Sequence, residues 1–355
     1  MFGWVQVLRG LAAAMVVSVH YVAAQIGRGA SAGAGLQEFG GSGVDIFFVI
    51  SGFIMMVTQS DSARPSSAKD FLLRRTARII PLYWALTALL AALVLVAGSA
   101  INTQISLPKF LMSMLFLPYG ETAIDMSAMA HTAYVIPMSW TLTYEWYFYL
   151  VFAVTLALDL SPASRLKFMS VWFAACVAAG LAFRPAPLIL QVITSPLVFE
   201  FLLGCSVALI YKRGHRLNGL QASLLALVAM LILSEIFHHT VFGRTLIWGL
   251  AAFALIAAAT LYEGRISGLA PAVRPFTWLG DISYSLYLSH FFTVAFFVRL
   301  QKRFTLVGDG FGPLTLIAFA TLALLVAAFC YRFIEQPAKR TFARKNPGAD
   351  MPPPA

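Results

Sequence analysis

Long apolar stretches separated by short polar connections run through almost the whole chain. Ten of them reach or approach the length that a helix needs to cross the hydrocarbon core of a bilayer. They cover residues 4–24, 44–59, 79–98, 139–158, 167–183, 188–211, 220–237, 244–262, 280–299 and 313–333. The pattern predicts an all-α, polytopic integral membrane protein with about ten transmembrane helices.

The composition excludes a soluble globular domain. Of the 355 residues, 60% are hydrophobic and 11% are charged, whereas an ordinary soluble domain is about 25% charged. The mean hydropathy of the chain is +0.80. All three cysteines (Cys176, Cys205 and Cys330) lie within predicted spans, so we expect small apolar side chains rather than a disulfide framework.

The net charge of +10 matters less for its size than for its distribution. With the N-terminus in the cytoplasm, seventeen Lys and Arg residues fall inside, seven fall outside, and Arg9 stays within the first span. The positive-inside rule then places both termini in the cytoplasm, as in a multi-pass protein of the bacterial inner (plasma) membrane. Because these cations are scattered over short loops, membrane lipid is expected as a partner and nucleic acid is not. The inner cations are Arg64, Lys69, Arg74, Arg75, Arg78, Arg165, Lys167, Lys212, Arg213, Arg216, Arg265, Arg274, Arg332, Lys339, Arg340, Arg344 and Lys345, and the outer ones are Arg28, Lys109, Arg184, Arg244, Arg299, Lys302 and Arg303.

Two ionisable residues, Arg9 and His20, interrupt the first apolar stretch. Eleven residues at about 100° each leave an offset of roughly 20° and a rise of about 16 Å, so both side chains lie on one helix face. Intramembrane ionisable groups usually face a protein interior and are functional candidates. The alternative is a cleavable signal peptide, with an apolar region over 11–19 and a small-residue site at 22–24; the loop charges leave it open.

Asp45 lies at the outer end of the second span, roughly level with His20. A carboxylate beside an imidazole can orient the ring, fix its tautomer and raise its basicity. Asp45 also suits the N-terminus of a helix, where the dipole favours a negative charge. The two interpretations are compatible.

Three arginines, Arg74, Arg75 and Arg78, stand at the cytoplasmic entry to the third span. Residues three or four apart share one helix face, and planar guanidinium groups suit phosphate oxygens. The alternative is ordinary cytoplasmic anchoring of the helix.

Two further polar sets fall within spans. Glu145 enters a helix crowded with aromatic residues and needs a buried cation as its partner, for which Arg9 is one candidate. Ser283, Tyr287 and His290 form a polar stripe at helical spacing. The alternative for this stripe is a purely structural hydrogen-bond network between helices.

The connections allow one transmembrane domain, 1–337, followed by a basic, Pro-rich disordered tail, 338–355. The longest outer connection, 100–138, contains a short apolar segment at 110–117 and is a candidate lid or acceptor-binding element. His238 and His239 are expected to be surface residues, and no metal-ligand spacing appears elsewhere.

Six segments, in this order, resemble acyltransferase family 3, whose members are membrane O-acyltransferases that modify polysaccharides, O-antigens and related acceptors. They are RGLAAAMVVSVH (9–20), GVDIFFVISGF (43–53), RRTARIIPLYW (74–84), SWTLTYEWYFY (139–149), SYSLYLSH (283–290) and FIEQP (333–337). The resemblance implies a ten-helix fold, a cytoplasmic acyl-coenzyme A donor (acetyl-CoA by family frequency) and a carbohydrate or other hydroxylated acceptor outside.

Family roles carried over by the resemblance make His20 the catalytic histidine, Arg9 its companion, and Arg75 and Arg78 the donor-binding cations. Glu145 and His290 match motif positions with less settled roles. At Gln336, where some relatives have Arg, an ionic role is in doubt.

The residues fit this chemistry independently. Acyl transfer from a thioester to a hydroxyl needs a base, stabilisation of an oxyanion and a site that excludes water. His20 can take the proton, Asp45 can support the imidazolium, and Arg9 can stabilise negative charge. A pantetheine arm of about 15–20 Å is comparable to the rise from Arg9 to His20. Direct transfer and an acyl-histidine intermediate both remain open.

A proton-coupled transporter would use the same buried His, Asp, Glu and Arg groups. Transporters more often show paired repeats or broken helices, and no internal repeat is detected in this chain. A structural membrane protein would not need six ordered polar motifs. The sequence therefore favours an acyltransferase over both.

Overall fold

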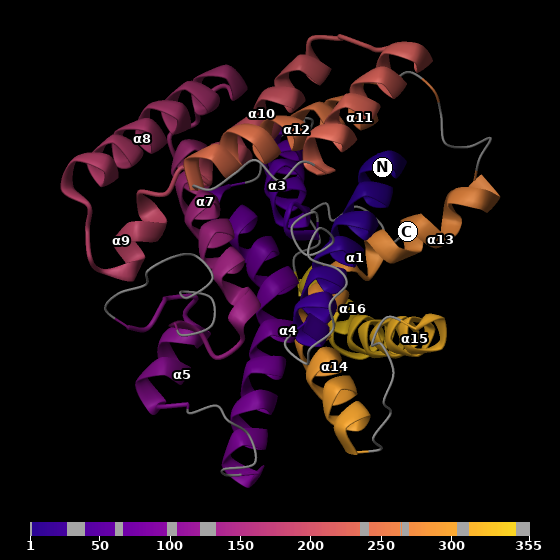
Figure 1. Cartoon of the computed structure of the whole chain (residues 1–355). Helices are drawn as coiled ribbons and strands as arrows, with labels where there is room; N and C mark the ends of the chain where they lie inside the picture. Colours follow the sequence, from indigo (N-terminus) through magenta and orange to yellow (C-terminus); the bar gives the residue numbers. More distant parts are fainter. Residues whose placement is uncertain are drawn as a thin grey trace. The chain divides into compact units, whose positions relative to one another are not determined.

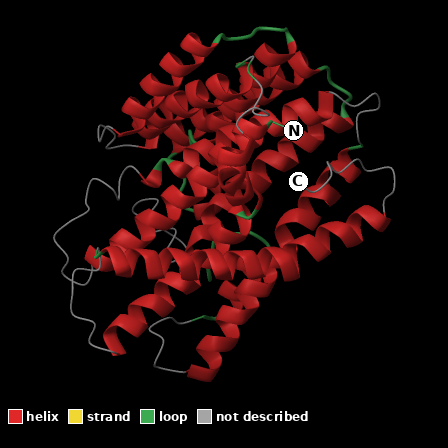
Figure 2. Cartoon of the chain, turned by 90° about the vertical axis from the view of Figure 1, so that its right-hand side faces the viewer, coloured by secondary structure: helices red, strands yellow, loops and turns green. Residues whose placement is uncertain are grey.

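The computed structural model describes residues 2–26, 40–60, 67–97, 105–120, 133–234, 241–262, 264, 270–303 and 312–345. Apart from one isolated bridge between Leu217 and Tyr262, every regular element in these ranges is a helix (Figure 2). The chain divides into two compact units: the first comprises 1–58, 200–336 and 350–355, and the second comprises 59–199 and 337–349. The all-α prediction is confirmed.

Each predicted span coincides with helical structure (Figure 1). Six candidate spans are long and apolar enough to cross a membrane, and α3 and α11 are shorter apolar helices, as a polytopic membrane protein requires. The total of ten crossings remains a prediction. The helices are α1 Gly3–Ile26, α3 Gly43–Ser60, α4 Ala68–Ala97, α7 Trp140–Ala157, α8 Pro162–Phe183, α9 Leu188–Ile193, α10 Val198–Lys212, α11 Gly219–Ser234, α12 Val241–Leu261, α14 Ser283–Arg303 and α15 Pro313–Cys330.

The predicted span 188–211 is not one continuous helix. It breaks between α9 and α10, where Pro196 lacks the N–H that a helix interior needs. The remaining elements are α5 Leu107–Met114, α13 Ala270–Asp281, α16 Gln336–Lys345, the 3-10 turn η2 Pro137–Ser139 and the π-helical turn η4 Tyr331–Glu335.

Helix α16 shows that part of the C-terminal segment expected to be disordered is helical. The basic part of the expected disordered tail, from residue 338 to Lys345, is helical. Its Ala, Lys and Arg residues are good helix formers, and Pro337 is tolerated in the first helical turn. Residues 346–355 of that tail, like the His238–His239 pair, lie outside the described residues.

In the first unit, α1 packs against α13, α14 and α15. Ala13, Val17 and Tyr21 of α1 join a buried apolar cluster with Ile282, Leu286, Phe297, Phe319, Ala323 and Ala327. Tyr21 stacks on Phe319 with ring centroids 4.2 Å apart. Glycine permits the close crossing of α1 and α13, because a Cβ at Gly280 would overlap the backbone carbonyl of Gln6. This crossing fixes the start of α14 beside α1.

In the second unit, α5 is tied to α4. The Tyr83 hydroxyl donates to the Ser113 carbonyl at 2.8 Å, and the Trp84 indole donates to the Met114 carbonyl at 2.9 Å. Tyr134 hydrogen-bonds Thr143 of α7, whose hydroxyl donates to the Phe116 carbonyl at 2.7 Å. The described part of the candidate lid is therefore anchored, and residues 100–104 and 121–132 of that connection lie outside the described residues.

Candidate active site

Helices α1 and α14 carry facing polar pairs along their contact. The Arg9 guanidinium donates to the Ser283 hydroxyl at 3.1 Å. Further along, the rings of His20 and His290 lie with centroids 4.9 Å apart. The last pair joins Gln25 to Gln301 at 2.9 Å. Because residue numbers rise together in all three pairs, the helices run parallel, and Arg9 and His20 face one neighbour, as their spacing predicts.

A polar network surrounds the Arg9 end of this contact. Arg9 also donates to the Gln6 side-chain oxygen at 2.8 Å, and the Gln6 amide donates to the carboxylate of Asp281. Two residues further along α14, the Ser285 hydroxyl donates to Glu335 at 2.6 Å. Glu335 is buried within the π-helical turn η4, a type of turn that is frequent at functional sites. Glu335 thus connects the segment FIEQP (333–337) to α14.

The structure fixes the tautomer of His20. Its Nδ1 lies 2.8 Å from the carbonyl oxygen of Val16, one turn earlier on α1. A carbonyl oxygen can only accept, so Nδ1 carries the hydrogen in the neutral ring. The lone pair is then on Nε2. This is the nitrogen that a histidine uses as a general base or nucleophile.

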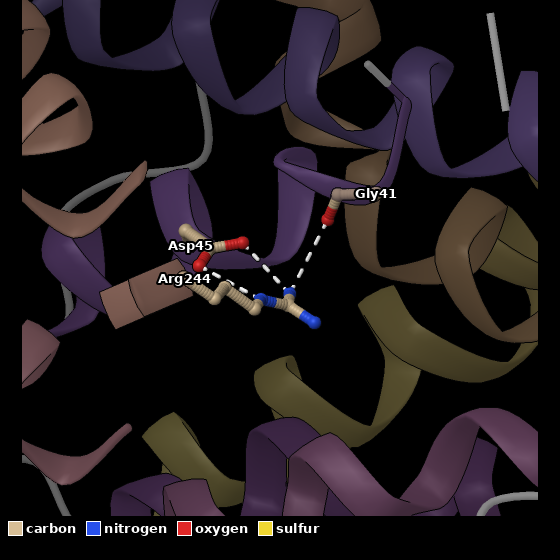
Figure 3. Close-up of polar contacts among 3 residues, drawn as sticks. All are labelled: Gly41, Asp45 and Arg244. Atoms are coloured by element: carbon tan, nitrogen blue, oxygen red, sulfur yellow. Dashed lines mark hydrogen bonds and ion pairs between the residues drawn. The ribbon is translucent and has the colours of Figure 1, made fainter. Parts of the chain in front are cut away.

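Asp45 forms a buried ion pair with Arg244 of α12 (Figure 3). The two side chains bind through Nε to Oδ1 at 3.1 Å and a terminal nitrogen to Oδ2 at 2.7 Å. Asp45 is fully buried, and the Arg244 side chain is 17% exposed and packs over the Trp248 ring. The predicted support of His20 by Asp45 remains a prediction, whereas the ion pair with Arg244 is the contact observed.

The same ion pair holds the start of α3 against α1. Arg244 also donates to the Gly41 carbonyl at 3.4 Å. The adjacent glycines sit directly on α1, because a Cβ at Gly40 or Gly43 would meet the carbonyl oxygens of Met15 or Ala12. These carbonyls belong to the turns that carry Val16 and His20. Arg244 therefore acts on the surroundings of the His20 hydrogen bond through its bonds to Asp45 and Gly41.

Two charged residues of this network, Arg244 and the acidic residue Glu200, are not among the site residues predicted from the sequence. Glu200 of α10 is fully buried, interacts electrostatically with Asp45 and Arg244, and lies against Gly249 of α12. The sequence predicts Arg244 to be an outer cation because the predicted span 244–262 begins at this residue. The signal that identifies it is chemical: Asp45 is an acidic residue within a span and requires a cation from another helix.

We expect Arg244→Ala to lower the stability of the protein strongly. Removing one partner of a buried ion pair leaves an uncompensated charge and typically costs about 3–5 kcal/mol. The measurement is the unfolding midpoint of the detergent-solubilised protein. Arg274→Ala, an exposed arginine of α13, is the matched control and should change little. The double variant Asp45→Asn, Arg244→Gln should recover part of the loss; an unchanged midpoint for Arg244→Ala would contradict the role given to this pair.

In the second unit, Arg75 is buried among aromatic residues. Only 9% of it is exposed, and its guanidinium lies over the rings of Phe71 and Tyr149, at 5.4 and 5.7 Å from their centroids. The Tyr149 hydroxyl donates to Glu145, whose charge also attracts Arg75. Glu145 thus has a buried cation in its own unit. Among the described residues, Nε of Arg75 has no hydrogen-bond partner.

The burial of Arg75 distinguishes it from its neighbours. Arg74 and Arg78, on the same helix, are partly exposed. An arginine that only anchors a helix extends toward lipid headgroups and water, whereas Arg75 points into the protein. Its planar guanidinium, which packs over two aromatic rings, is suited to bind a phosphate.

In the part of the chain that the structure describes, no group of three or more His, Cys, Asp or Glu residues could hold a metal ion. The first unit supplies the imidazole of His20 and a buried ion pair. The second unit supplies a buried guanidinium next to a carboxylate. These groups suit proton transfer and the binding of an anionic substrate.

Comparisons with known proteins agree with this chemistry. The family model described as "Acyltransferase domain" matches residues 2–332. The exopolysaccharide production protein ExoZ of Rhizobium meliloti is 29% identical over 85% of this chain and 90% of its own length. The acyltransferase MdmB of Streptomyces mycarofaciens is 25% identical over 98% and 94%. A putative peptidoglycan O-acetyltransferase of Bacillus subtilis, YrhL, is 23% identical over 85% and 52%. No solved structure is significantly similar to this chain.

Proposed function

Because the chain belongs to the acyltransferase 3 family, we propose that it transfers an acyl group from cytoplasmic acyl-coenzyme A to a hydroxyl of a carbohydrate. The observation that carries this proposal is the hydrogen bond from Nδ1 of His20 to the Val16 carbonyl, which places the lone pair that can take a hydroxyl proton on Nε2. That the protein is an acyltransferase follows from its family; the donor and acceptor are the proposed part.

The donor is proposed to bind through Arg75, with Arg78 on the same face of α4. Coenzyme A carries several phosphates, and a guanidinium can bind phosphate oxygens with two parallel hydrogen bonds. The buried Nε of Arg75 supports this role, because a buried donor without a partner is costly unless a ligand supplies one. Acetyl is proposed as the acyl group.

The acceptor is proposed to be a polysaccharide or a lipid-linked carbohydrate. This rests on the names of two relatives, one for exopolysaccharide production and one for peptidoglycan O-acetylation. A carbohydrate offers a hydroxyl, which becomes a nucleophile when a base removes its proton.

The proposed roles follow from the contacts. His20 takes the proton of the acceptor hydroxyl as that oxygen bonds to the thioester carbon. The C–S bond then breaks, and the proton passes to the sulfur of coenzyme A. Arg9, which bonds Gln6 and Ser283, provides a positive charge on α1 eleven residues before His20. Asp45 and Arg244 hold α3 against the His20 turn.

The test of this function uses the purified protein in vesicles of bacterial phospholipid with radiolabelled acetyl-coenzyme A. We expect thiol release and movement of the label to an oligosaccharide of a bacterial exopolysaccharide. A proton-coupled transporter would instead move protons across the vesicle membrane without thiol release. Absence of both thiol release and labelled product would overturn the proposal.

Both termini are proposed to be cytoplasmic, in the bacterial inner membrane. Burial of Arg244 in an ion pair removes one of the seven outer cations, leaving six against seventeen inner ones. Reporter fusions at Asn218 and after the last residue should both report cytoplasm. A periplasmic signal from either fusion, or a mature protein beginning at Gln25, would refute this topology.

A further inference from the structure

His290 of α14 is a buried imidazole that the proposed function does not yet use. It is fully buried, its ring lies 4.9 Å from that of His20 and 5.9 Å from that of Tyr287, and it belongs to the same contact of α1 and α14. Among the described residues, neither ring nitrogen has a hydrogen-bond partner. The carbonyls of Leu286 and Tyr287 lie near the ring, but not in hydrogen-bonding geometry.

This lack of partners separates His290 from a structural polar residue. Polar side chains that join helices in a membrane do so through hydrogen bonds, and each one left unmade costs free energy. Ser283 and Gln301 of the same helix follow that rule, since each bonds a residue of α1. His290 does not, although it lies between them. A substrate group is the partner that such a side chain would have during turnover.

The residue roles proposed above do not include a hydrogen-bond donor for the oxyanion that forms beside His20. Attack of a hydroxyl on a thioester places a negative charge on the carbonyl oxygen, and catalysis requires a hydrogen-bond donor at that oxygen. His20 cannot supply it, because its own N–H is bound to the Val16 carbonyl and its Nε2 takes the proton. Arg9 lies eleven residues away, about 16 Å along α1, where it bonds Gln6 and Ser283.

We propose that His290 is a second catalytic residue, whose ring N–H donates a hydrogen bond to the oxyanion formed when a hydroxyl attacks the donor thioester beside His20. The proposal rests on the acyltransferase function above. In this step the hydroxyl oxygen bonds to the thioester carbon, and the proton moves to Nε2 of His20. The C–S bond then breaks, the carbonyl re-forms, and the proton leaves with the coenzyme A sulfur.

His290 remains neutral in this step for an electrostatic reason. When His20 has taken the proton, a second positive ring 4.9 Å away in a buried region would repel it strongly. A neutral imidazole always has one N–H. His290 is therefore a fixed donor, while His20 is the group that changes its protonation.

Three substitutions distinguish a donor from a base. His290→Ala removes the N–H and should lower kcat by about 100–1000-fold, with donor affinity unchanged. His290→Asn places an amide N–H near Nδ1, and His290→Gln places one near Nε2; neither amide can take up a proton at neutral pH. We expect one of the two to restore kcat to within about tenfold of the parent, since only a donor is required.

The assay follows label from radiolabelled acetyl-coenzyme A to the exopolysaccharide oligosaccharide, with coenzyme A binding and the unfolding midpoint recorded for each variant. Unchanged kcat for His290→Ala would overturn the proposal. So would equal inactivity of the Ala, Asn and Gln variants when each binds coenzyme A and unfolds like the parent. An inactive parent protein would instead refute the function itself. Normal activity of His290→Ala beside an inactive His20→Ala would refute only the role of His290.

Discussion

Replacing His20 with alanine should stop acyl transfer while leaving coenzyme A binding intact. Loss of a general base typically lowers the rate by about 100–10,000-fold, and by more if the histidine also carries the acyl group. His20→Gln should be equally inactive, because an amide cannot accept the hydroxyl proton. Asp45→Asn should reduce the rate less, since it weakens the packing of α3 against the His20 turn but leaves the ring in place.

The measurement compares product formed, coenzyme A bound and the amount of inserted protein for each variant. His215→Ala is the matched control, because His215 is an exposed histidine of the first unit and should behave like the parent. Near-normal turnover by His20→Ala would remove the base from the mechanism. An inactive His20→Gln variant would show that position 20 needs a proton acceptor. At position 290, by contrast, we expect an amide to restore kcat, because a hydrogen-bond donor is sufficient there.

The second large effect concerns Arg75 and Arg78. The double variant to alanine should weaken coenzyme A binding, because each charged hydrogen bond lost costs about 1.5–3 kcal/mol, or roughly 10- to 150-fold in Kd. Arg75 alone should account for most of the loss, since it is the buried member of the pair. Arg75→Lys should not restore binding fully, because an ammonium lacks the planar pair of donors that a guanidinium presents to a phosphate.

Binding is measured by equilibrium dialysis of radiolabelled coenzyme A with the detergent-solubilised protein. Lys69→Ala is the matched control: it removes a positive charge from the same end of α4, but from an exposed residue. If Lys69→Ala weakens binding as much as Arg75→Ala does, general attraction explains the data and no specific phosphate site exists. Unchanged binding in a correctly inserted double variant would return both arginines to helix anchoring.

Hydrophobic pattern was sufficient to predict the long apolar helices, because a span must be apolar over its whole length. Each of the ten predicted spans overlaps at least one helix of the structure. The pattern did not predict the break at Pro196, since the stretch 188–211 is apolar throughout and the proline effect is local. Helix α16 was missed for the opposite reason: it is too polar to resemble a span.

The candidate site shows a different limit. Helical spacing predicted that Arg9 and His20 share a face, and both meet α14. Asp45 was predicted to neighbour His20 because both lie at about the same depth in the membrane. Equal depth does not determine the direction around the helix in which a side chain points. The structure turns Asp45 toward Arg244. A pattern along one helix identifies its buried face, whereas the partner of that face depends on packing between distant segments.

The contacts that complete the surroundings of α1 come from very late in the chain. Gln6, Arg9 and Gln25 pair with residues 275, 274 and 276 positions further on. During synthesis, α1 therefore enters the bilayer with an arginine and a histidine whose α14 partners have not yet been made. Arg9 and His20 meet these neighbours only after α13 and α14 are made, about 14–55 s later at ordinary rates of synthesis. A chain that ends before residue 283 would therefore lack the Ser283 hydroxyl that Arg9 bonds and the His290 ring that lies beside His20.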